Sequence, residues 1–240
     1  MIEAGHQPDY LPWLGFFDKI KNCDVFIIED NIQFERQGFR NRNKIKTSDG
    51  VKWLTVPIKH VGENVPINEI QINNYAEKDW ATRHWLTIKH NYSRAPYWDK
   101  YSTLIEEAYS QKWDLLIDLN MHFIKLIMSW LDIKKPLVYA SNLEAPGKKG
   151  ELLISQCKAL GADTHLSGSG GLNYIDKKRF EQEGIKLIFQ DFKYPVYDQL
   201  YGEYEPNLSV IDYLLCTGGA PWVSHNIETV EAVEKNGKIR

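Results

Sequence analysis

Cysteine is scarce in this sequence of 240 residues, which contains only Cys23, Cys157 and Cys216. The three are far apart and odd in number, and the sequence has neither a CxxC pair nor a cysteine and histidine cluster with the spacing of metal ligands. This argues against a disulfide framework and against structural zinc. We expect free, buried, non-catalytic thiols that lie beside core residues rather than beside a histidine or a cationic loop, so that none has a lowered pKa.

Long apolar runs and an excess of one charge are also missing. No stretch approaches the roughly 18 apolar residues that cross a membrane, and the first residues lack the basic and apolar regions of a signal peptide. The net charge of -3 and the isoelectric point of about 6.2 give no reason to expect binding to nucleic acid or to a membrane. We expect a cytoplasmic protein with small-molecule ligands, and the sequence is compatible with a homodimer.

Internal repeats and Pro/Gly linkers are absent as well, so we expect one domain over residues 1–240. Short apolar runs alternate with segments of helical periodicity, which predicts an open, mostly parallel Rossmann-like α/β sheet with helices on both faces. The expected strands are 2–4, 25–28, 53–58, 70–72, 137–140, 164–166 and 186–189. The expected helices are 150–160, 177–183 and 210–216, together with a helical insertion at about 76–132.

The first candidate site is the turn-rich loop that begins at His6, between the first predicted strand and helix. A helix N-terminus presents free N–H groups to a ligand there, and an imidazole can donate to a phosphate or to charge developing on a leaving group. That His6 only caps the loop is an equally compatible alternative. Aromatic residues make up 12% of the chain and line binding sites as well as cores. The candidate ligand-binding residues of this loop are Gln7, Tyr10 and Trp13.

A basic run follows the second predicted strand. Guanidinium groups match the geometry of phosphate and carboxylate, so Arg42 and Lys44, with Asn41 and Asn43 between and beside them, are candidates for an anion clamp. The alternative is a solvated basic loop. If the run is a strand, Arg40, Arg42 and Lys44 share one face, while Asn41 and Asn43 share the other.

A glycine-rich segment follows the strand predicted at 164–166. A turn of this kind brings backbone N–H groups close to a phosphate or acyl group, although no Gly-Lys-Ser/Thr sequence follows and the segment is not a P-loop. The candidate binding residues are Ser167, Gly168, Ser169, Gly171 and Tyr174. Serine-hydrolase, zinc-protease, metal-binding DxD and kinase signatures are absent.

Several short motifs occur in order along the chain: HQPDYLPWLG from His6, QF from Gln33, NRN from Asn41, WLTVP from Trp53, HLSG from His165, YID from Tyr174 and SVID from Ser209. Together they resemble the WbqC-like family over nearly the whole chain, to about Gly219. The resemblance implies a role in the biosynthesis of O-antigen or another bacterial surface polysaccharide. It further implies that an amino acid such as glycine, or another small acyl group, is attached to an amino sugar.

The loop at His6, the helix after it and the second strand near Gln33 also resemble the opening of pantoate–β-alanine ligases and other nucleotidylyl transferases. That signature has two histidines, and here the neighbourhood of the second is occupied by Trp13, Leu14 and Gly15. The more distant resemblance implies that ATP and Mg²⁺ are used, and the missing histidine leaves an ATP-independent reaction open.

The expected enzyme is therefore an amide-forming ligase or an acyl or aminoacyl transferase acting on a nucleotide-linked amino sugar. His6 and Arg42 would stabilise charge on phosphates, and Asp212 or Asp30 would accept the proton of the amine. The alternatives are a transferase with a pre-activated donor and a non-catalytic sugar-nucleotide-binding or scaffold protein. We expect His6 and the loop after Ser167 at one rim of the sheet, within the roughly 20 Å span of one crevice.

Overall fold

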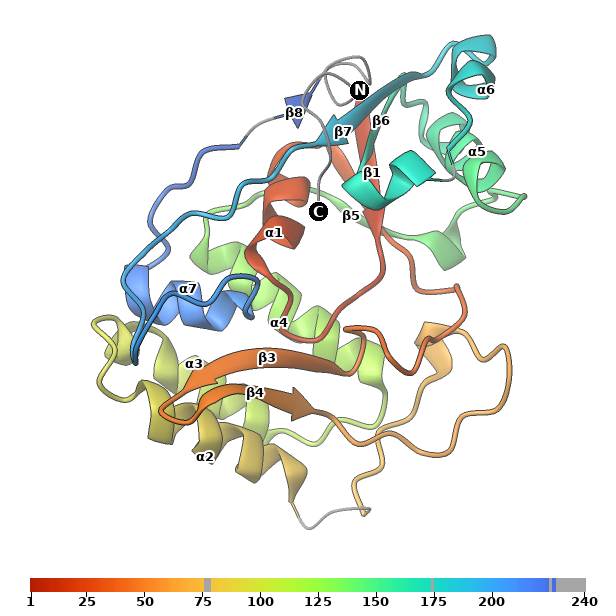
Figure 1. Cartoon of the computed structure of the whole chain (residues 1–240). Helices are drawn as coiled ribbons and strands as arrows, with labels where there is room; N and C mark the ends of the chain where they lie inside the picture. The colour runs from red at the N-terminus through yellow and green to blue at the C-terminus, as the bar shows by residue number, and fades with distance from the viewer. Residues whose placement is uncertain (76–78, 174, 225, 228–240) are drawn as a thin grey trace.

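Six strands form one open sheet in the computed structural model, which describes residues 1–75, 79–173, 175–224 and 226–227 (Figure 1). The strand order is β5-β2-β1-β6-β7-β8. Five neighbouring strands run parallel, and only β8 is antiparallel, to β7. The bounds are β1 Ile2–His6, β2 Val25–Ile28, β5 Leu137–Tyr139, β6 Thr164–Ser167, β7 Lys186–Gln190 and β8 Asn226–Ile227. The predicted open, mostly parallel α/β sheet is confirmed.

Helices cover both faces of this sheet. Successive side chains of a strand point to opposite sides, so the contacts of β1 show which helix lies on which face. Phe16 of α1 contacts the ring of His6 on one face of β1, and Cys157 of α5 donates to the carboxylate of Glu3 on the other. The helices are α1 Leu14–Lys21, α2 Trp80–Tyr92, α3 Trp98–Ser110, α4 Leu116–Trp130, α5 Gly150–Leu160, α6 Lys177–Gln182 and α7 Val210–Thr217.

The helices expected within the insertion are α2, α3 and α4, which lie below the sheet in Figure 1 beside an antiparallel hairpin. The strands of this hairpin are β3 Arg42–Thr47 and β4 Gly50–Thr55. Apolar residues of α4 recur every three or four positions, so they form one stripe that is buried when the helix packs. Phe123 and Ile127 of this stripe belong to the same buried cluster as Ala4 and Phe26 of the sheet. The insertion and the sheet therefore share one hydrophobic core.

The strand expected at 70–72 does not form. Ile72 and Gln71 make only isolated bridges, with Ile58 and Leu115. Ile70 and Ile72 are buried and Gln71 is exposed, so the alternating pattern comes from a segment that packs one side on the core without joining a ladder.

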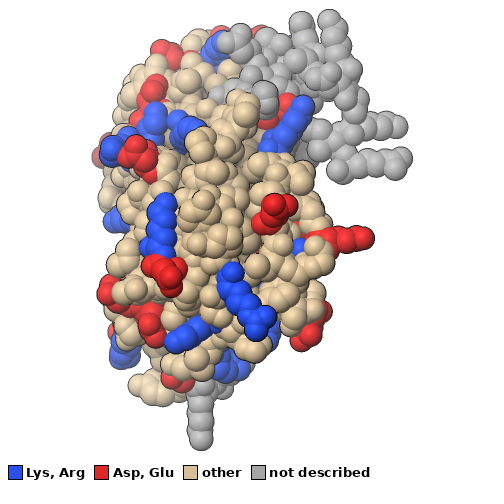
Figure 2. Space-filling view, turned by 90° about the vertical axis from the view of Figure 1, so that its left-hand side faces the viewer, with Lys and Arg blue, Asp and Glu red and all other residues tan. Residues whose placement is uncertain are grey.

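Within the described part of the chain, no helix has the length and apolar character needed to cross a membrane. Figure 2 shows one face of the molecule, on which lysine and arginine side chains are interspersed with aspartate and glutamate. Opposite charges at short range cancel at distances beyond about 10 Å in salt, so this face presents a mixed field, as expected from the low net charge.

Candidate functional site

A cavity of about 1000 Å³ opens at the carboxyl ends of β1, β2 and β6. Open α/β sheets bind their ligands at this edge. The lining residues come mainly from the β1–α1 loop, the end of β2, the segment before β3, the first turn of α5 and the glycine-rich loop after β6. They are Gly5, His6, Gln7, Asp9, Trp13, Lys19, Glu29, Ile32, Glu35, Phe39, Arg40, Lys44, Lys149, Leu152, Leu153, His165, Ser167, Gly168, Gly170, Gly171 and Asn207.

The pairing of β1 with β6 brings the two expected loops together. Glu3 of β1 pairs in register with His165 of β6, and the strands are parallel. The loops that follow His6 and Ser167 therefore leave the sheet side by side, and both residues line the cavity together with Gly168.

His6 presents its imidazole to the cavity in a defined tautomer. Its Nδ1 lies 2.9 Å from the carbonyl oxygen of Gln7, and a carbonyl can only accept, so Nδ1 carries the proton and Nε2 is left as an acceptor. Burial lowers the pKa of His6, Lys19 and Arg40 lower it further, and Asp9, with a carboxylate oxygen 3.9 Å from Nδ1, opposes them. The neutral ring is thus the form present at pH 7, and it can accept a proton.

Glu29 follows β2 and reaches the floor of the cavity. Its Oε1 accepts a hydrogen bond of 2.9 Å from Gln156, whereas its buried Oε2 has no partner among the described residues. Burial raises the pKa of this carboxyl from 4.5 to about 7, the hydrogen bond opposes the rise, and the charge of Glu3 adds to it. A carboxyl that titrates near neutrality at the wall of a cavity is suited to proton transfer.

Lys19 of α1 is a second buried ionisable group on the same wall. Its Nζ donates to the carbonyl of Gly5 at 2.8 Å. Burial lowers the pKa of Lys19 from 10.5 to about 8, and the negative charges of Glu3 and Glu29 oppose this change. A Cβ built on Gly168 would lie 3.9 Å from Nζ, so the ammonium group faces the glycine-rich loop. It supplies positive charge beside that loop.

Asp9 and Arg40 form a buried ion pair on the opposite wall. The two charged groups are 2.7 Å apart, with side chains 5% and 12% exposed, and both residues line the cavity. The Nε of Arg40 and the Oε1 of Gln7 are buried and lack a partner among the described residues. Buried polar atoms of this kind are normally satisfied, and here they provide bonding capacity beside the cavity.

Within the glycine-rich loop, Gly168 and Gly170 have room for a side chain, whereas Gly171 does not. A Cβ on Gly171 would lie 2.0 Å from Oγ of Ser167, so the close approach of the two segments requires glycine here. Ser169 lines a second cavity of about 430 Å³, which shares His6 and Trp13 with the first. Tyr174 lies outside the described residues.

A comparison with family models matches the model of the WbqC-like protein family to residues 7–221. The chain belongs to the WbqC-like protein family. It is 34% identical over 215 residues, covering 88% of this chain and 92% of its relative, to "Uncharacterized protein Rv1507c" from Mycobacterium tuberculosis. No solved structure matches it significantly.

Asp212 of this WbqC-like protein lies in the core and does not line the cavity. Its carboxylate is fully buried and accepts hydrogen bonds of 2.7 Å from the hydroxyls of Tyr92 and Tyr197. Burial raises its pKa, while these bonds and the charge of Lys46 lower it. The expectation that Asp212 accepts the proton of an amine needs correction: the carboxyl holds α7 to its neighbours, and the carboxyls that line the cavity are those of Asp9, Glu29 and Glu35.

Three of the expected binding residues are structural supports of the WbqC-like fold. Asn41 donates to the carbonyl of Val56, and Asn43 donates to the carbonyls of Leu11 and Tyr10 at 2.7 and 3.2 Å. The fully buried Tyr10 hydroxyl lies 2.9 Å from Nδ1 of His84 and also contacts the hydroxyl of Tyr109. None of the three lines the cavity, and each instead fixes the course of the loop or of the segment beside it.

The basic run is divided between the surface and the site. Its final part is a strand, as considered from the sequence, with Arg42 and Lys44 on one face and the buried Asn43 on the other. The guanidinium of Arg42 donates to the carbonyl of Gln37 at 2.8 Å and lies 4.5 Å from the centroid of the Trp53 ring. Lys44 lines the cavity and Arg42 does not, so Arg42 is not in the expected place for an anion clamp.

All three cysteines are free. Burial raises the pKa of Cys23 and of Cys216 to about 12, and it raises that of Cys157 further. As expected, none of the three thiols has a lowered pKa. The expectation that no cysteine lies beside a histidine is wrong for Cys157, which lies beside Glu3 and His165.

Glu29, Lys19 and Asp9 are cavity groups to which the sequence motifs assigned no role, whereas Arg40 belongs to the basic run considered as an anion clamp. Glu29 carried a usable signal, since it directly follows an apolar strand of a parallel sheet, where side chains face the ligand crevice. Lys19 interrupts the apolar stripe of α1, and a lysine at such a position is expected from the sequence to be exposed, whereas it is buried in the structure. Asp9 lies inside the motif that begins at His6. Only the folded structure shows that Arg40 of the basic run forms an ion pair with it.

Proposed function

We propose that this WbqC-like protein is an enzyme of bacterial surface-polysaccharide biosynthesis that attaches an amino acid or small acyl group to the amine of a nucleotide-linked amino sugar. The observation that carries the proposal is the Glu29 carboxyl, which is buried at the floor of a large cavity and has a pKa of about 7. An amine is protonated at neutral pH and must lose its proton before it attacks an acyl carbon. A base that titrates near pH 7 serves this step best.

The neighbouring groups support an acceptor of mixed chemistry. The Glu29 carboxylate would take the proton of the amine, and the neutral His6, whose Nε2 is an acceptor, would accept a second N–H and orient the nitrogen. Lys19 and Lys44 supply positive charge on the cavity wall, and the glycine-rich loop at Gly168 borders the same space. Phosphates are bound by such donors, which favours a nucleotide-linked sugar over a free one.

The donor must be activated, because a free carboxylate does not react with an amine at neutral pH. In the ATP-dependent form of the proposal, the carboxylate attacks the α-phosphorus of ATP with Mg²⁺ present and releases pyrophosphate. The amine then attacks the acyl carbon, Glu29 takes the proton, and AMP leaves. The cations at Lys19, Lys44 and Arg40 would stabilise charge on the phosphates in the first step.

The test is a matrix of nucleotide-linked amino sugars against amino acids, with and without ATP and Mg²⁺, in which the mass of the sugar product is measured. Exchange of radiolabelled pyrophosphate into ATP is measured in parallel. We expect the sugar to gain the mass of one acyl group and Glu29→Gln to lose this transfer by about 10²–10⁴-fold. Glu35→Gln, which changes an exposed carboxylate of the same cavity, is the matched control and should retain activity.

The outcomes separate the parts of the proposal. Pyrophosphate exchange that persists in Glu29→Gln supports ATP activation and assigns Glu29 to the second step. Transfer from a pre-activated donor alone contradicts the ATP-dependent form and retains acyl transfer. Tight binding of nucleotide sugars without transfer from either kind of donor contradicts enzymatic function and identifies a binding protein.

A further inference from the structure

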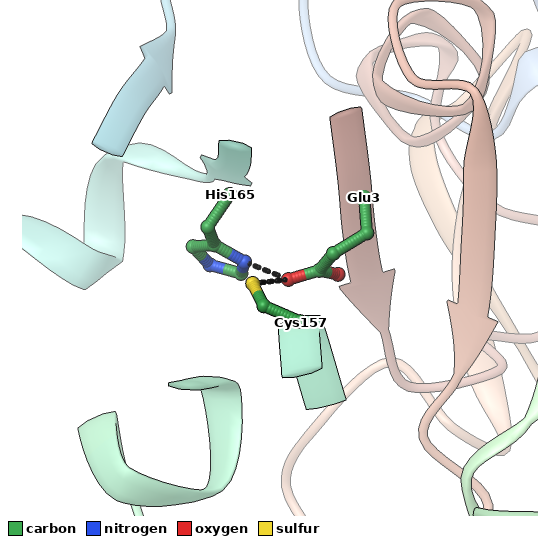
Figure 3. A group of neighbouring side chains, drawn as sticks. All are labelled: Glu3, Cys157 and His165. Atoms are coloured by element: carbon green, nitrogen blue, oxygen red, sulfur yellow. Dashed lines mark hydrogen bonds and ion pairs between the residues drawn. The ribbon is translucent and has the colours of Figure 1, made fainter. Parts of the chain in front are cut away.

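Three buried side chains with different donor atoms converge behind the cavity (Figure 3). Glu3 of β1 and His165 of β6 are register partners in a parallel pair, so their side chains share one face of the sheet. Cys157 of α5, which covers that face, points its sulfur at them. The carboxylate oxygen, the imidazole nitrogen and the sulfur all lie within 4.8 Å of one another. Residues 3, 157 and 165 are too scattered in the sequence for any spacing rule to reveal the group.

The hydrogen bonds of this group leave a buried charge partly satisfied. Oε1 of Glu3 is contacted by Nδ1 of His165 and by Sγ of Cys157, the latter at 3.0 Å. Oε2 is buried and has no partner among the described residues. Glu3 and Cys157 are 0% exposed and His165 is 2% exposed, and a carboxylate at such depth is stable only if its charge is compensated.

We infer that Glu3, Cys157 and His165 bind a divalent transition metal, with zinc as the ion that best fits the donor set. One thiolate sulfur, one imidazole nitrogen and one carboxylate oxygen are the ligand types of tetrahedral zinc sites. Ca²⁺ and Mg²⁺ prefer oxygen ligands alone and are a poor match. Zinc with bonds of about 2.0–2.3 Å holds its ligands about 3–4 Å apart, so modest rotations of these side chains form the site. The thiol releases its proton to solvent as the metal binds.

The metal would act on the cavity through the backbone. It joins β1, β6 and α5, and these elements carry His6, Ser167 and Leu152 into the cavity wall. His165 also lines the cavity, which places the fourth coordination position within reach of a water molecule. The inference does not depend on the proposed function, since its test measures metal alone. The rival account is a metal-free hydrogen-bonded group of a thiol, a carboxylate and an imidazolium.

The test uses the full chain without an affinity tag, dialysed against a chelator. Zinc is titrated in competition with a chromophoric chelator, and Co²⁺ is titrated as a spectroscopic probe. We expect one zinc ion per chain with a dissociation constant below about 1 μM. Co²⁺ should give the sulfur-to-cobalt charge-transfer band of thiolate ligation and the intense visible bands of tetrahedral geometry. Lack of zinc binding, or a cobalt spectrum without the sulfur band, would overturn the inference on the wild-type chain alone.

Substitutions then assign the ligands. Cys157→Ser is close to isosteric and should abolish the sulfur-to-cobalt band and weaken zinc binding by at least about 100-fold, and Glu3→Gln should weaken it by at least tenfold. Cys216→Ser is the matched control, because that thiol lies in α7 and outside the cluster, and it should leave both readouts unchanged. Circular dichroism checks that each variant is folded. A sulfur band that persists in Cys157→Ser and disappears in Cys216→Ser would refute the site.

Discussion

Replacing Glu29 with glutamine tests whether the cavity carboxyl titrates near neutrality. Its pKa rises from 4.5 to about 7 on folding, and at about 1.4 kcal/mol for each pKa unit this corresponds to about 3 kcal/mol. Because the folded pKa is the higher one, the carboxyl favours folding fully below its unfolded pKa, and this contribution is lost as the pH rises through about 7. A glutamine keeps an oxygen that can accept from Gln156 and carries no charge at any pH.

The wild-type protein should therefore lose stability relative to Glu29→Gln as the pH rises. We expect the difference in unfolding free energy to change by about 2–3 kcal/mol between about pH 5 and pH 8.5, in favour of the variant at the alkaline end. Urea denaturation followed by the fluorescence of the eight tryptophans measures it. Using the difference between the two proteins removes titrations that both share.

Glu35→Gln is the control, since this carboxylate is exposed and also lines the cavity. Its stability difference from wild type should be flat across the same pH range. A flat difference for Glu29→Gln would refute the near-neutral titration of Glu29. If Glu29→Gln is more stable than wild type at alkaline pH but has the same transfer activity, the burial of Glu29 costs stability and Glu29 is not the base.

Three further substitutions test the placement of other groups. Asp212→Ala should reduce stability by about 2–4 kcal/mol in urea denaturation, because it removes a buried acceptor of two hydroxyls, and ligand affinity measured by calorimetry should stay unchanged. Gly171→Ala should lower the melting temperature through overpacking of about 1–3 kcal/mol. Adding Ser167→Gly should restore part of the loss, since Ser167 carries the closest clashing atom and Cδ1 of Ile175, at 2.9 Å, is the next. Lys44→Ala should weaken binding of a nucleotide sugar about three- to tenfold, whereas Arg42→Ala should change this affinity less than about twofold. A larger effect of Arg42→Ala than of Lys44→Ala would show that Arg42 is the anion ligand.

Local pattern predicts the elements well where it and tertiary packing agree. The helix expected at 150–160 has these bounds, since its apolar periodicity ends at Gly161, which takes the left-handed conformation with φ 68°. The strand at Val25–Ile28 is equally clear from its continuous apolar run. Parallel pairing of the strands then brings the loops at His6 and Ser167 to one rim without further information. These features depend on chain direction and burial, which the sequence encodes locally.

Side-chain environment is what the sequence could not supply. Arg42 looked like a phosphate ligand because it lies in a basic run. In the structure its guanidinium lies over the ring of Trp53, which belongs to the partner strand β4. Asp212 looked catalytic because it belongs to a family motif, and its role is set by two tyrosines outside that motif, Tyr92 and Tyr197. The shifted pKa values of Glu29 and Lys19 arise mainly from burial, which is a property of the assembled core.

The bonds to the carbonyls of the β1–α1 loop also determine when that loop becomes ordered. Leu11 is buried with φ 44°, a conformation that is unfavourable for a residue with a side chain. Asn43 holds its carbonyl, and Asn120 of α4 holds those of Pro8 and Arg40, each at 2.8 Å. The conformational entropy of the loop is thus lost when the chain folds, and a ligand does not have to order it on binding. Asn120 does not line the cavity, yet changing it should make the loop mobile and weaken binding without removing a single contact to the ligand.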